Sequence, residues 1–351
     1  MKIIHIESGL GNQMLSYCEY LAMKKSNPTD EIFIENIIYD IPECNDVICQ
    51  WNGYELERIF NIKAPNIKDY FSAELWEQIM NDIKRSKFWL RNWNYPVHFT
   101  NAFNNAGLEI KNIRGDFEAD GIRVAYDQNR KFSFKDKIRN KDWYIFLHYK
   151  KNRIQEYYLS KNVDYRSRLF IHSNENLFTG QLLLFKRINC GIENIEDEIR
   201  ASFKFPPLIN KRDINISALI QSNNSVAIHA RRGDMLGFNY PLYKFGYFQR
   251  AVKYIKRNIK NPVYFIFCDP DSVLWAKKNE HILGLDFSKD KVYFIDWNKG
   301  NDSFRDMQLM AQCKHQIITN SSFGWWAAWL NEYPNKITIS PNYLINTTKV
   351  V

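Results

Sequence analysis

The sequence lacks a metal-binding cysteine motif and a long apolar segment, and both absences narrow the class of protein. No Cys-x-x-Cys pair occurs and no histidine stands at zinc-ligand spacing, so neither a zinc site nor a disulfide framework is expected. No run approaches the roughly 18 apolar residues of a membrane span, and the first residues lack a signal-peptide core. We expect a cytosolic protein with reduced, mostly buried thiols. The six cysteines are Cys18, Cys44, Cys49, Cys190, Cys268 and Cys313.

Dense basic runs and recognisable nucleic-acid-binding modules are also missing. The 48 basic and 39 acidic side chains give a net charge of +9. This moderate charge favours anionic ligands such as sugar nucleotides, and peripheral contact with the inner face of an anionic membrane, over nucleic acid. A chain of 351 residues with 45% hydrophobic and 25% charged residues suits a soluble protein of two domains.

The first 35 residues predict a strand, a loop, a helix and a second strand. The expected strand is 3–6, the loop is 9–13, the helix runs through Met14 and Leu21, and the second strand is 31–35. Between 40 and 200 only helices near 70–89 and 192–203 can be predicted. The prolines of 205–208 and the polar residues 210–213 suggest a boundary, so we expect domains 1–207 and 208–351.

Beyond this boundary, strands and helices alternate regularly. That alternation predicts an α/β fold with a parallel, doubly wound sheet. The expected strands are 225–229, 263–267, 292–295, 316–319 and 336–340, and the expected helices include 244–259, 303–313 and 325–331.

Polar side chains follow several of these strands, at the edge where parallel sheets bind ligands. His229, Arg231, Arg232 and Asp234 follow the first strand of this domain. The two guanidinium groups suit a diphosphate, and His229 and Asp234 can orient them or read a base. A surface Arg-Asp pair after a core strand is the alternative.

A second loop at the same edge has the character of an anion site. Asn320, Ser321, Ser322 and Phe323 lie at a strand-to-helix turn, where hydroxyl groups and free backbone amides hold phosphates. Taken alone, the serines are better explained as ordinary helix caps. The tryptophans that follow can form core or stack on a sugar. Two such loops at one edge favour a nucleotide diphosphate.

The opening loop permits two interpretations. Gly9-x-Gly11 after a strand resembles the start of a dinucleotide-binding fingerprint, and Glu35 stands where that fingerprint has its ribose-binding acid. The third glycine is missing, because Met14 occupies its position. An NAD-dependent oxidoreductase is therefore the alternative. In the preferred interpretation, the amides of Asn12 and Gln13 bind a sugar or phosphate.

Three motifs together resemble the α-1,2-fucosyltransferase family, glycosyltransferase family 11. The similarity is specific over 225–340 and the first 20 residues, weaker over 195–200, and almost absent over 35–180. The family's aromatic segment appears only as 180–184, which leaves the acceptor and linkage open. The motifs are Gly9-Leu-Gly-Asn-Gln-Met14, His229-Ala-Arg-Arg-Gly-Asp234, and Asp306-Met-Gln-Leu-Met-Ala-Gln-Cys-Lys-His315 followed by Asn320-Ser-Ser-Phe-Gly-Trp-Trp-Ala-Ala-Trp-Leu330.

The resemblance implies a fold and a reaction. The implied fold is α/β and GT-B-like, with two Rossmann-like domains facing a cleft. The N-terminal domain is irregular and lies on the acceptor side, and the last residues of the chain pack back on this N-terminal domain. The reaction transfers fucose from GDP-fucose, with inversion and without a metal or other cofactor. The implied acceptor is a galactose-terminated glycan, lipid-linked, in surface polysaccharide synthesis. A nucleotide-sugar-binding protein without turnover is a further alternative.

The resemblance also implies roles for individual residues. Arg231 stabilises the leaving diphosphate, and Asn12 approaches the fucose or the acceptor from the other domain. By their positions alone, Glu7, His5 and Asp234 are candidates for the base, although His5 inside an Ile-His-Ile strand favours a structural role. The predicted catalytic residues are Arg231, Asn12 and Asp234, and the predicted donor-binding residues are His229, Arg231, Arg232, Asp234, Asp306, Asn320, Ser321, Ser322, Phe323, Gly11 and Gln13.

Overall fold

The computed structural model describes residues 1–44, 52–90, 95–112, 133–139, 141–160, 172–180 and 192–341. It contains two compact units, and the last boundary between them lies between Pro206 and Pro207. Residues 133–159, which hold α5 (Phe134–Arg139) and most of α6 (Asp142–Ser160), are grouped with the second unit. Cys49, Cys190, most of 180–184 and the last ten residues, predicted to pack back, lie outside the described residues.

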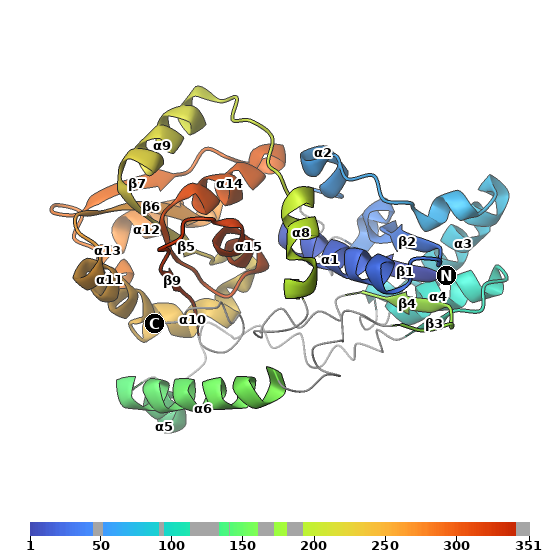
Figure 1. The fold of residues 1–351 in the computed structure, drawn as a ribbon, viewed down its shortest axis with the longest axis horizontal. Helices are drawn as coiled ribbons and strands as arrows, with labels where there is room; N and C mark the ends of the chain where they lie inside the picture. Colours follow the sequence, from blue (N-terminus) through green and yellow to red (C-terminus); the bar gives the residue numbers. More distant parts are fainter. Residues whose placement is uncertain are drawn as a thin grey trace. The chain divides into compact units, whose positions relative to one another are not determined.

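The first unit is built on a small parallel sheet with the strand order β2-β1-β4-β3 (Figure 1). The predicted β-α-β opening is confirmed, because β1 and β2 pair in parallel on either side of α1 in the sequence. The strands are β1 (Lys2–His5), β2 (Ile32–Glu35), β3 (Lys111–Asn112) and β4 (Leu177–Thr179), and the α-helices are α1 (Leu10–Ser26), α2 (Leu56–Phe60), α3 (Ala73–Ser86), α4 (Tyr95–Asn105) and α8 (Glu196–Ser202).

The core of this unit lies between the sheet and the helices α3 and α4. Ser72 caps α3 by accepting a hydrogen bond from the Leu75 amide at 3.3 Å, and Ile79 and Ile83 are buried one turn apart. They pack in one cluster with aromatic residues of α4 and Phe178 of β4. The helices predicted near 70–89 and 192–203 are therefore confirmed, with α8 preceded by one 3₁₀ turn.

The second unit has a five-stranded parallel sheet with the order β7-β6-β5-β8-β9. This order, in which β5 lies in the middle and the chain turns to the other side at β8, is that of a doubly wound fold. All five predicted strands are present. The strands are β5 (Asn224–Ala230), β6 (Pro262–Cys268), β7 (Lys291–Ile295), β8 (His315–Ile317) and β9 (Thr338–Ile339), and the α-helices are α9 (Lys211–Ser222), α10 (Leu236–Lys244), α11 (Tyr247–Asn258), α12 (Val273–Lys278), α13 (Glu280–Leu283), α14 (Phe304–Gln312) and α15 (Ser322–Leu330).

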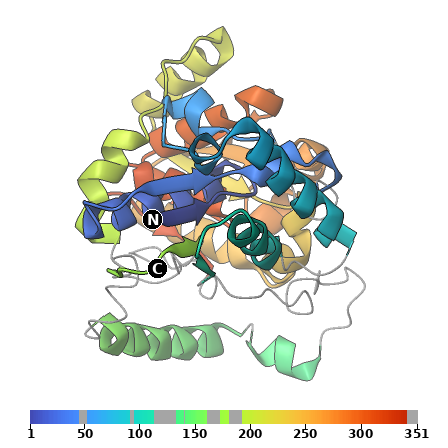
Figure 2. The same ribbon diagram turned by 90° about the vertical axis from the view of Figure 1, so that its right-hand side faces the viewer.

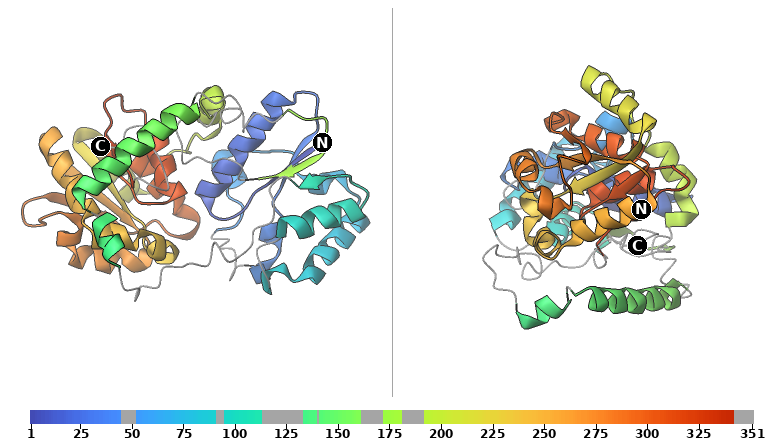
Figure 3. Two further views of the ribbon diagram at one scale, coloured as in Figure 1. Left: turned by 90° about the horizontal axis from the view of Figure 1, so that it is seen from below. Right: turned by 90° about the vertical axis from the view of Figure 1, so that its left-hand side faces the viewer.

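Helices cover both faces of this sheet (Figure 3). Alternate residues of β5, such as Val226 and Ile228, pack with α10, α11 and α13 in one apolar cluster. The opposite face of β5 carries His229, which lies against α15. The prediction of an α/β fold with two Rossmann-like parts is thus confirmed, whereas the cleft between them stays a prediction.

Two helices differ from the sequence-based expectation. Residues 210–213, which we expected to be a chain break, begin α9, because the Asn210 side chain accepts from the Arg212 amide at 2.8 Å. Helix α10 was not predicted, since Pro241 lies inside it. None of the helices in the described ranges combines the length and the apolar character needed to cross a membrane.

Candidate functional site

Two polar loops meet where the strand order of the second sheet reverses. β5 and β8 are neighbours, with Ile228 opposite Ile317, so the residues after their carboxyl ends lie side by side. Such a switch point is where doubly wound sheets bind ligands. The structure therefore brings the His229–Asp234 loop and the Asn320–Ser322 loop to one place.

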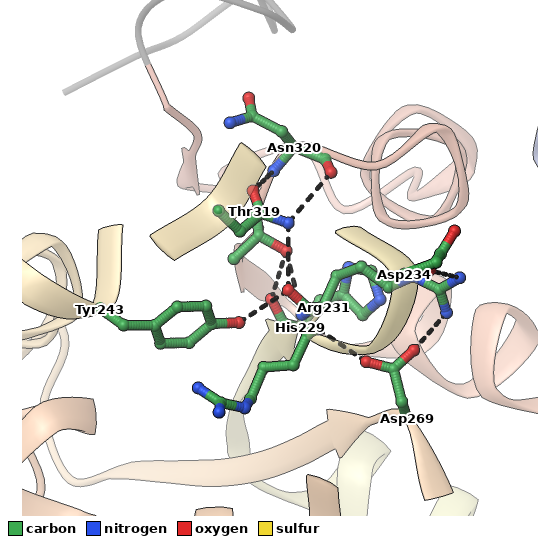
Figure 4. Close-up of polar contacts among 9 residues, drawn as sticks. His229, Arg231, Asp234, Tyr243, Asp269, Thr319 and Asn320 are labelled. Atoms are coloured by element: carbon green, nitrogen blue, oxygen red, sulfur yellow. Dashed lines mark hydrogen bonds and ion pairs between the residues drawn. The ribbon is translucent and has the colours of Figure 1, made fainter. Parts of the chain in front are cut away.

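Hydrogen bonds connect the two loops directly (Figure 4). The Arg231 amide donates to Thr319 Oγ1 at 3.1 Å, and the Thr319 hydroxyl donates to the His229 carbonyl at 3.1 Å. Thr319 is fully buried. A buried contact of this kind fixes the backbone that carries Arg231.

Two side chains of helix α10 bind the backbone of both loops. Asn239 is fully buried and donates to the carbonyls of Arg231 at 3.0 Å and Asn320 at 3.3 Å, while it accepts from the Asn320 amide at 3.1 Å. The Tyr243 hydroxyl donates to the same Arg231 carbonyl at 2.8 Å. Sequence reasoning missed both side chains, although their i, i+4 spacing places them on one helix face.

The Arg231 guanidinium is held between two carboxylates. Its Nη1 contacts Asp269 Oδ1 and its Nη2 donates to Asp234 Oδ1 at 2.8 Å. Asp269 also accepts from the Arg232 amide at 2.6 Å. The Asp269 side chain is only 9% exposed, whereas that of Asp234 is 46% exposed. Asp269 is thus the fixed partner and Asp234 the accessible one.

Arg232 has a different environment from Arg231. Its guanidinium carbon lies 3.7 Å from the centre of the Trp275 ring and 5.0 Å from that of Tyr243. Arginine stacks on aromatic faces because the ring quadrupole attracts the cation. Arg232 therefore packs on these two rings, and its predicted contact with a diphosphate stays a prediction.

His229 is buried against the start of α15. Burial and the neighbouring Arg231 lower the pKa of its imidazole to about 3, so the ring is neutral at physiological pH. A Cβ atom on Gly324 would lie 2.4 Å from His229 Nδ1, so only glycine leaves room for the ring. Nδ1 has no hydrogen-bond partner among the described residues.

The start of α15 agrees with an anion site. Ser321 is the N-cap residue, yet its side chain makes no capping hydrogen bond, and α15 begins at Ser322. The Asn320 side-chain oxygen is buried and has no partner within the described part of the chain. Buried polar atoms are normally satisfied, and a helix N-terminus attracts negative charge. Phe323 lies beside His229, with ring centres 5.9 Å apart.

The tryptophans of α15 belong to the core. Trp325 and Trp326 are 6% and 0% exposed, so the core interpretation is confirmed for these two. Stacking on a sugar would need an accessible ring face.

Asp306 belongs to a separate polar cluster beyond the end of β7. It accepts from Asn298 at 2.9 Å, and the same amide donates to Asp213 at 3.1 Å. The Trp297 indole also donates to Asp213, at 2.8 Å. Desolvation raises the pKa of the Asp306 carboxyl to about 8. The described contacts do not connect Asp306 with Arg231.

In the first unit, the predicted loop 9–13 is largely helical. α1 begins at Leu10, so Gly11, Asn12 and Gln13 form its first turn, and Gly9 is its extended N-cap residue. The buried Gln13 amide donates to the carbonyls of Ser8 at 2.9 Å and Gly53 at 2.8 Å and accepts from the Glu55 amide.

These contacts decide the roles of the loop residues. The prediction that the Gln13 amide binds a sugar or phosphate is not supported, because its polar atoms bind the protein. Gly11 is buried in the first turn of α1, and its predicted donor contact stays a prediction. Asn12 is half-buried and keeps its proposed role.

The two candidate bases of β1 lie in a buried network. His5 contacts Glu35 through Nδ1 and lies 3.5 Å from Glu7 through Nε2, and the Tyr95 hydroxyl contacts Glu7. Glu35 is fully buried and also accepts from the Ile37 amide. It is therefore not placed to bind the ribose of NAD.

Carboxylates and thiols in the described part show no arrangement for a metal ion. Asp269 and Asp271 stand two residues apart, but Asp269 is bound to the arginines. No cluster of three or more histidine, cysteine, aspartate or glutamate side chains forms there, and Cys18, Cys44, Cys268 and Cys313 are free thiols.

Comparison with known proteins identifies the segment that carries this site. Residues 184–348 match the model of glycosyl transferase family 11. The chain is 39% identical to an alpha-1,2-colitosyltransferase of Escherichia coli over 39% of this chain and 47% of that protein. It is 30% identical to the galactoside 2-alpha-L-fucosyltransferase SEC1 of Bos taurus over 30% of this chain and 28% of that protein.

The chain spans less than half the length of these curated relatives. A solved structure, the NodZ alpha-1,6-fucosyltransferase co-crystallised with GDP, aligns over 96% of this chain and 94% of that chain, with 14% identity and a TM-score of 0.44. The part of the chain that contains the β5–β8 loops, residues 184–348, belongs to glycosyl transferase family 11.

Proposed function

We propose that this protein is an inverting, metal-independent glycosyltransferase that moves fucose from GDP-fucose to a hydroxyl group of an acceptor glycan. The observation that carries the proposal is that Arg231 and the uncapped start of α15 both lie at the β5–β8 switch point. Family membership of this segment and the names of the relatives support a sugar-nucleotide donor. The finer assignment is an α-1,2 linkage to galactose in surface polysaccharide synthesis.

The residues present suggest how the diphosphate is held. Phosphate oxygens accept from the free amides and hydroxyls of Ser321 and Ser322, where the helix dipole favours negative charge. Arg231 keeps Asp269 as its partner and exchanges the exposed Asp234 for a phosphate oxygen. As the glycosidic bond breaks, charge grows on the leaving GDP, and Arg231 stabilises that charge more than it stabilises the bound donor. Asn12 contacts the fucose or the acceptor.

The test is release of GDP from GDP-fucose across a panel of galactosides, with linkage analysis of the product. We expect acceptor-dependent GDP release that a chelator does not affect. Arg231→Ala should lower the rate by about 10²–10³, as for other donors to a developing charge. Near-normal turnover of Arg231→Ala would contradict the assignment of Arg231.

The same experiments separate the alternatives. Binding of GDP without release across the panel would identify a nucleotide-sugar-binding protein. Thermal stabilisation by NAD and not by GDP would favour an oxidoreductase, although the contacts of Glu35 with His5 and the Ile37 amide do not favour it.

A further inference from the structure

The segment 133–160 concentrates exposed apolar side chains. Eleven large hydrophobic residues are exposed in the described part of the chain, and six of them lie in this segment. α6, the long green helix of Figures 1–3, carries most of them. The six are Phe134 at 77%, Trp143 at 59%, Leu147 at 58%, Ile154 at 59%, Tyr157 at 57% and Tyr158 at 69% exposure.

Four of these side chains form one stripe on α6. At about 100° per residue, positions 143, 147, 154 and 158 fall within an arc of about 60°. Lys151 is exposed at the edge of this arc. Lysine at such a position extends its aliphatic stem along the apolar surface and keeps its ammonium group in water.

The same segment carries much of the positive charge of the protein. Residues 133–160 contain seven basic and three acidic residues, a net charge of +4 out of +9 for the whole chain. Lys135, Lys137 and Arg139 of α5 are all exposed. An apolar stripe bordered by basic residues complements an anionic lipid surface, in which acyl chains lie below negative headgroups.

The residue types are those found at a lipid surface. Tryptophan and tyrosine prefer the headgroup level of a bilayer, because their rings are apolar and their N–H or O–H groups reach water. Leucine and isoleucine reach the acyl boundary below. We propose that α6, with the basic residues of α5, is a membrane-surface helix that lies flat on anionic phospholipid.

This inference does not depend on the proposed function, because lipid binding is measured without donor or acceptor. The experiment is co-sedimentation of the full chain with vesicles of phosphatidylcholine and phosphatidylglycerol, and with vesicles of phosphatidylcholine alone. We expect binding to the anionic vesicles, weaker but still measurable binding at high salt, and little binding to the neutral ones.

Two variants test the helix itself. The double variant Trp143→Ser/Leu147→Ser removes part of the apolar stripe and should weaken binding by about tenfold or more. The double variant Lys137→Gln/Lys151→Gln removes two positive charges and should weaken binding by about tenfold. The matched control is Ile209→Ser with Leu274→Ser, which removes residues that are 81% and 71% exposed elsewhere and should leave binding unchanged. All variants should unfold at the same temperatures as the wild type.

Other outcomes would overturn the proposal. Failure of the wild type to bind anionic vesicles, or equal binding by the Trp143/Leu147 variant and the control, would show that α6 is not the lipid contact. A monomer–dimer equilibrium that Trp143→Ser shifts toward monomer, with vesicle binding unchanged, would assign the stripe to a second copy of the chain.

Discussion

Asp269 holds the side chain of Arg231 and the backbone of Arg232 with one carboxylate. One oxygen contacts the Arg231 guanidinium and the other accepts from the Arg232 amide. The carboxylate also packs against Gly233, the residue after Arg232. A Cβ atom at this position, where φ is +27°, would lie 3.2 Å from the carboxylate. Asp269 is therefore a positioning residue for Arg231 in the proposed reaction.

Asp269→Asn should weaken this hold and lower kcat/KM for the donor. A hydrogen bond to a charged group contributes about 1.5–3 kcal/mol, which corresponds to about 10–150-fold. Asp271→Asn, two residues along and exposed, is the matched control and should stay near wild type. Asp234→Asn should keep or improve GDP affinity if Asp234 only competes with the phosphate for Arg231, whereas a loss of affinity would support the predicted role of Asp234 in donor binding. Equal activity of the Asp269 and Asp271 variants would rule out positioning by Asp269.

Gly324 and His229 form a second test at the residue scale. Alanine suits a helix, yet in Gly324→Ala the new methyl group meets the imidazole at 2.4 Å from Nδ1. We expect a loss of about 1–3 kcal/mol of stability from overpacking, measured by urea unfolding. In a His229→Ala background the same substitution should cost much less, because the collision is gone. Additive costs in the double variant would argue against this contact.

The strands of the second unit were predictable from sequence, because short apolar runs alternate with amphipathic helices. The partner of Arg231 was not. Asp269 lies 38 residues away and reaches Arg231 only because β5 and β6 pair with Ala230 opposite Cys268. Strand order is a tertiary property, set by packing rather than by local pattern. The contacts of Gln13 with Gly53 and Glu55, and of Arg232 with Trp275, could not be predicted for the same reason, since these partners are distant in sequence.

At the level of elements, His315 connects β8 to the chain before β9. Its Nδ1 accepts from the Ile337 amide at 3.1 Å, which requires a neutral ring. Burial, followed by Lys314, lowers the pKa of His315 to about 4. The unfolded chain therefore binds a proton that the folded chain does not between about pH 4 and 6.5. Stability from this group is present above that window and is lost as the pH falls through it.

His315→Gln keeps an acceptor but cannot titrate. Between pH 4.5 and 6.5, we expect the plot of unfolding free energy against pH to be less steep for this variant than for the wild type. The difference in slope should be at most about 1.4 kcal/mol per pH unit, the value for one proton. The exposed His281→Gln is the control and should keep the wild-type slope. A His315→Gln variant with the wild-type slope would place the titrating groups elsewhere.

At the scale of the whole molecule, the two units have separate sheets and separate apolar clusters. One cluster centres on β1, α3 and α4, and the other on β5, β6 and α11. Units with independent cores can unfold in separate steps. The short strands of the first sheet, two to four residues long, explain why its order could not be predicted from sequence.

This division predicts two unfolding transitions, only one of which responds to nucleotide. GDP placed at the β5–β8 loops binds the folded second unit and stabilises it by about 2.7 kcal/mol at a concentration of 100 Kd. We expect calorimetry to show two transitions, with GDP raising the temperature of one and leaving the other in place. Arg231→Ala should reduce that shift. A single transition that moves as a whole with GDP would show that the units unfold together, and a shift unaffected by Arg231→Ala would place the nucleotide away from the β5–β8 loops.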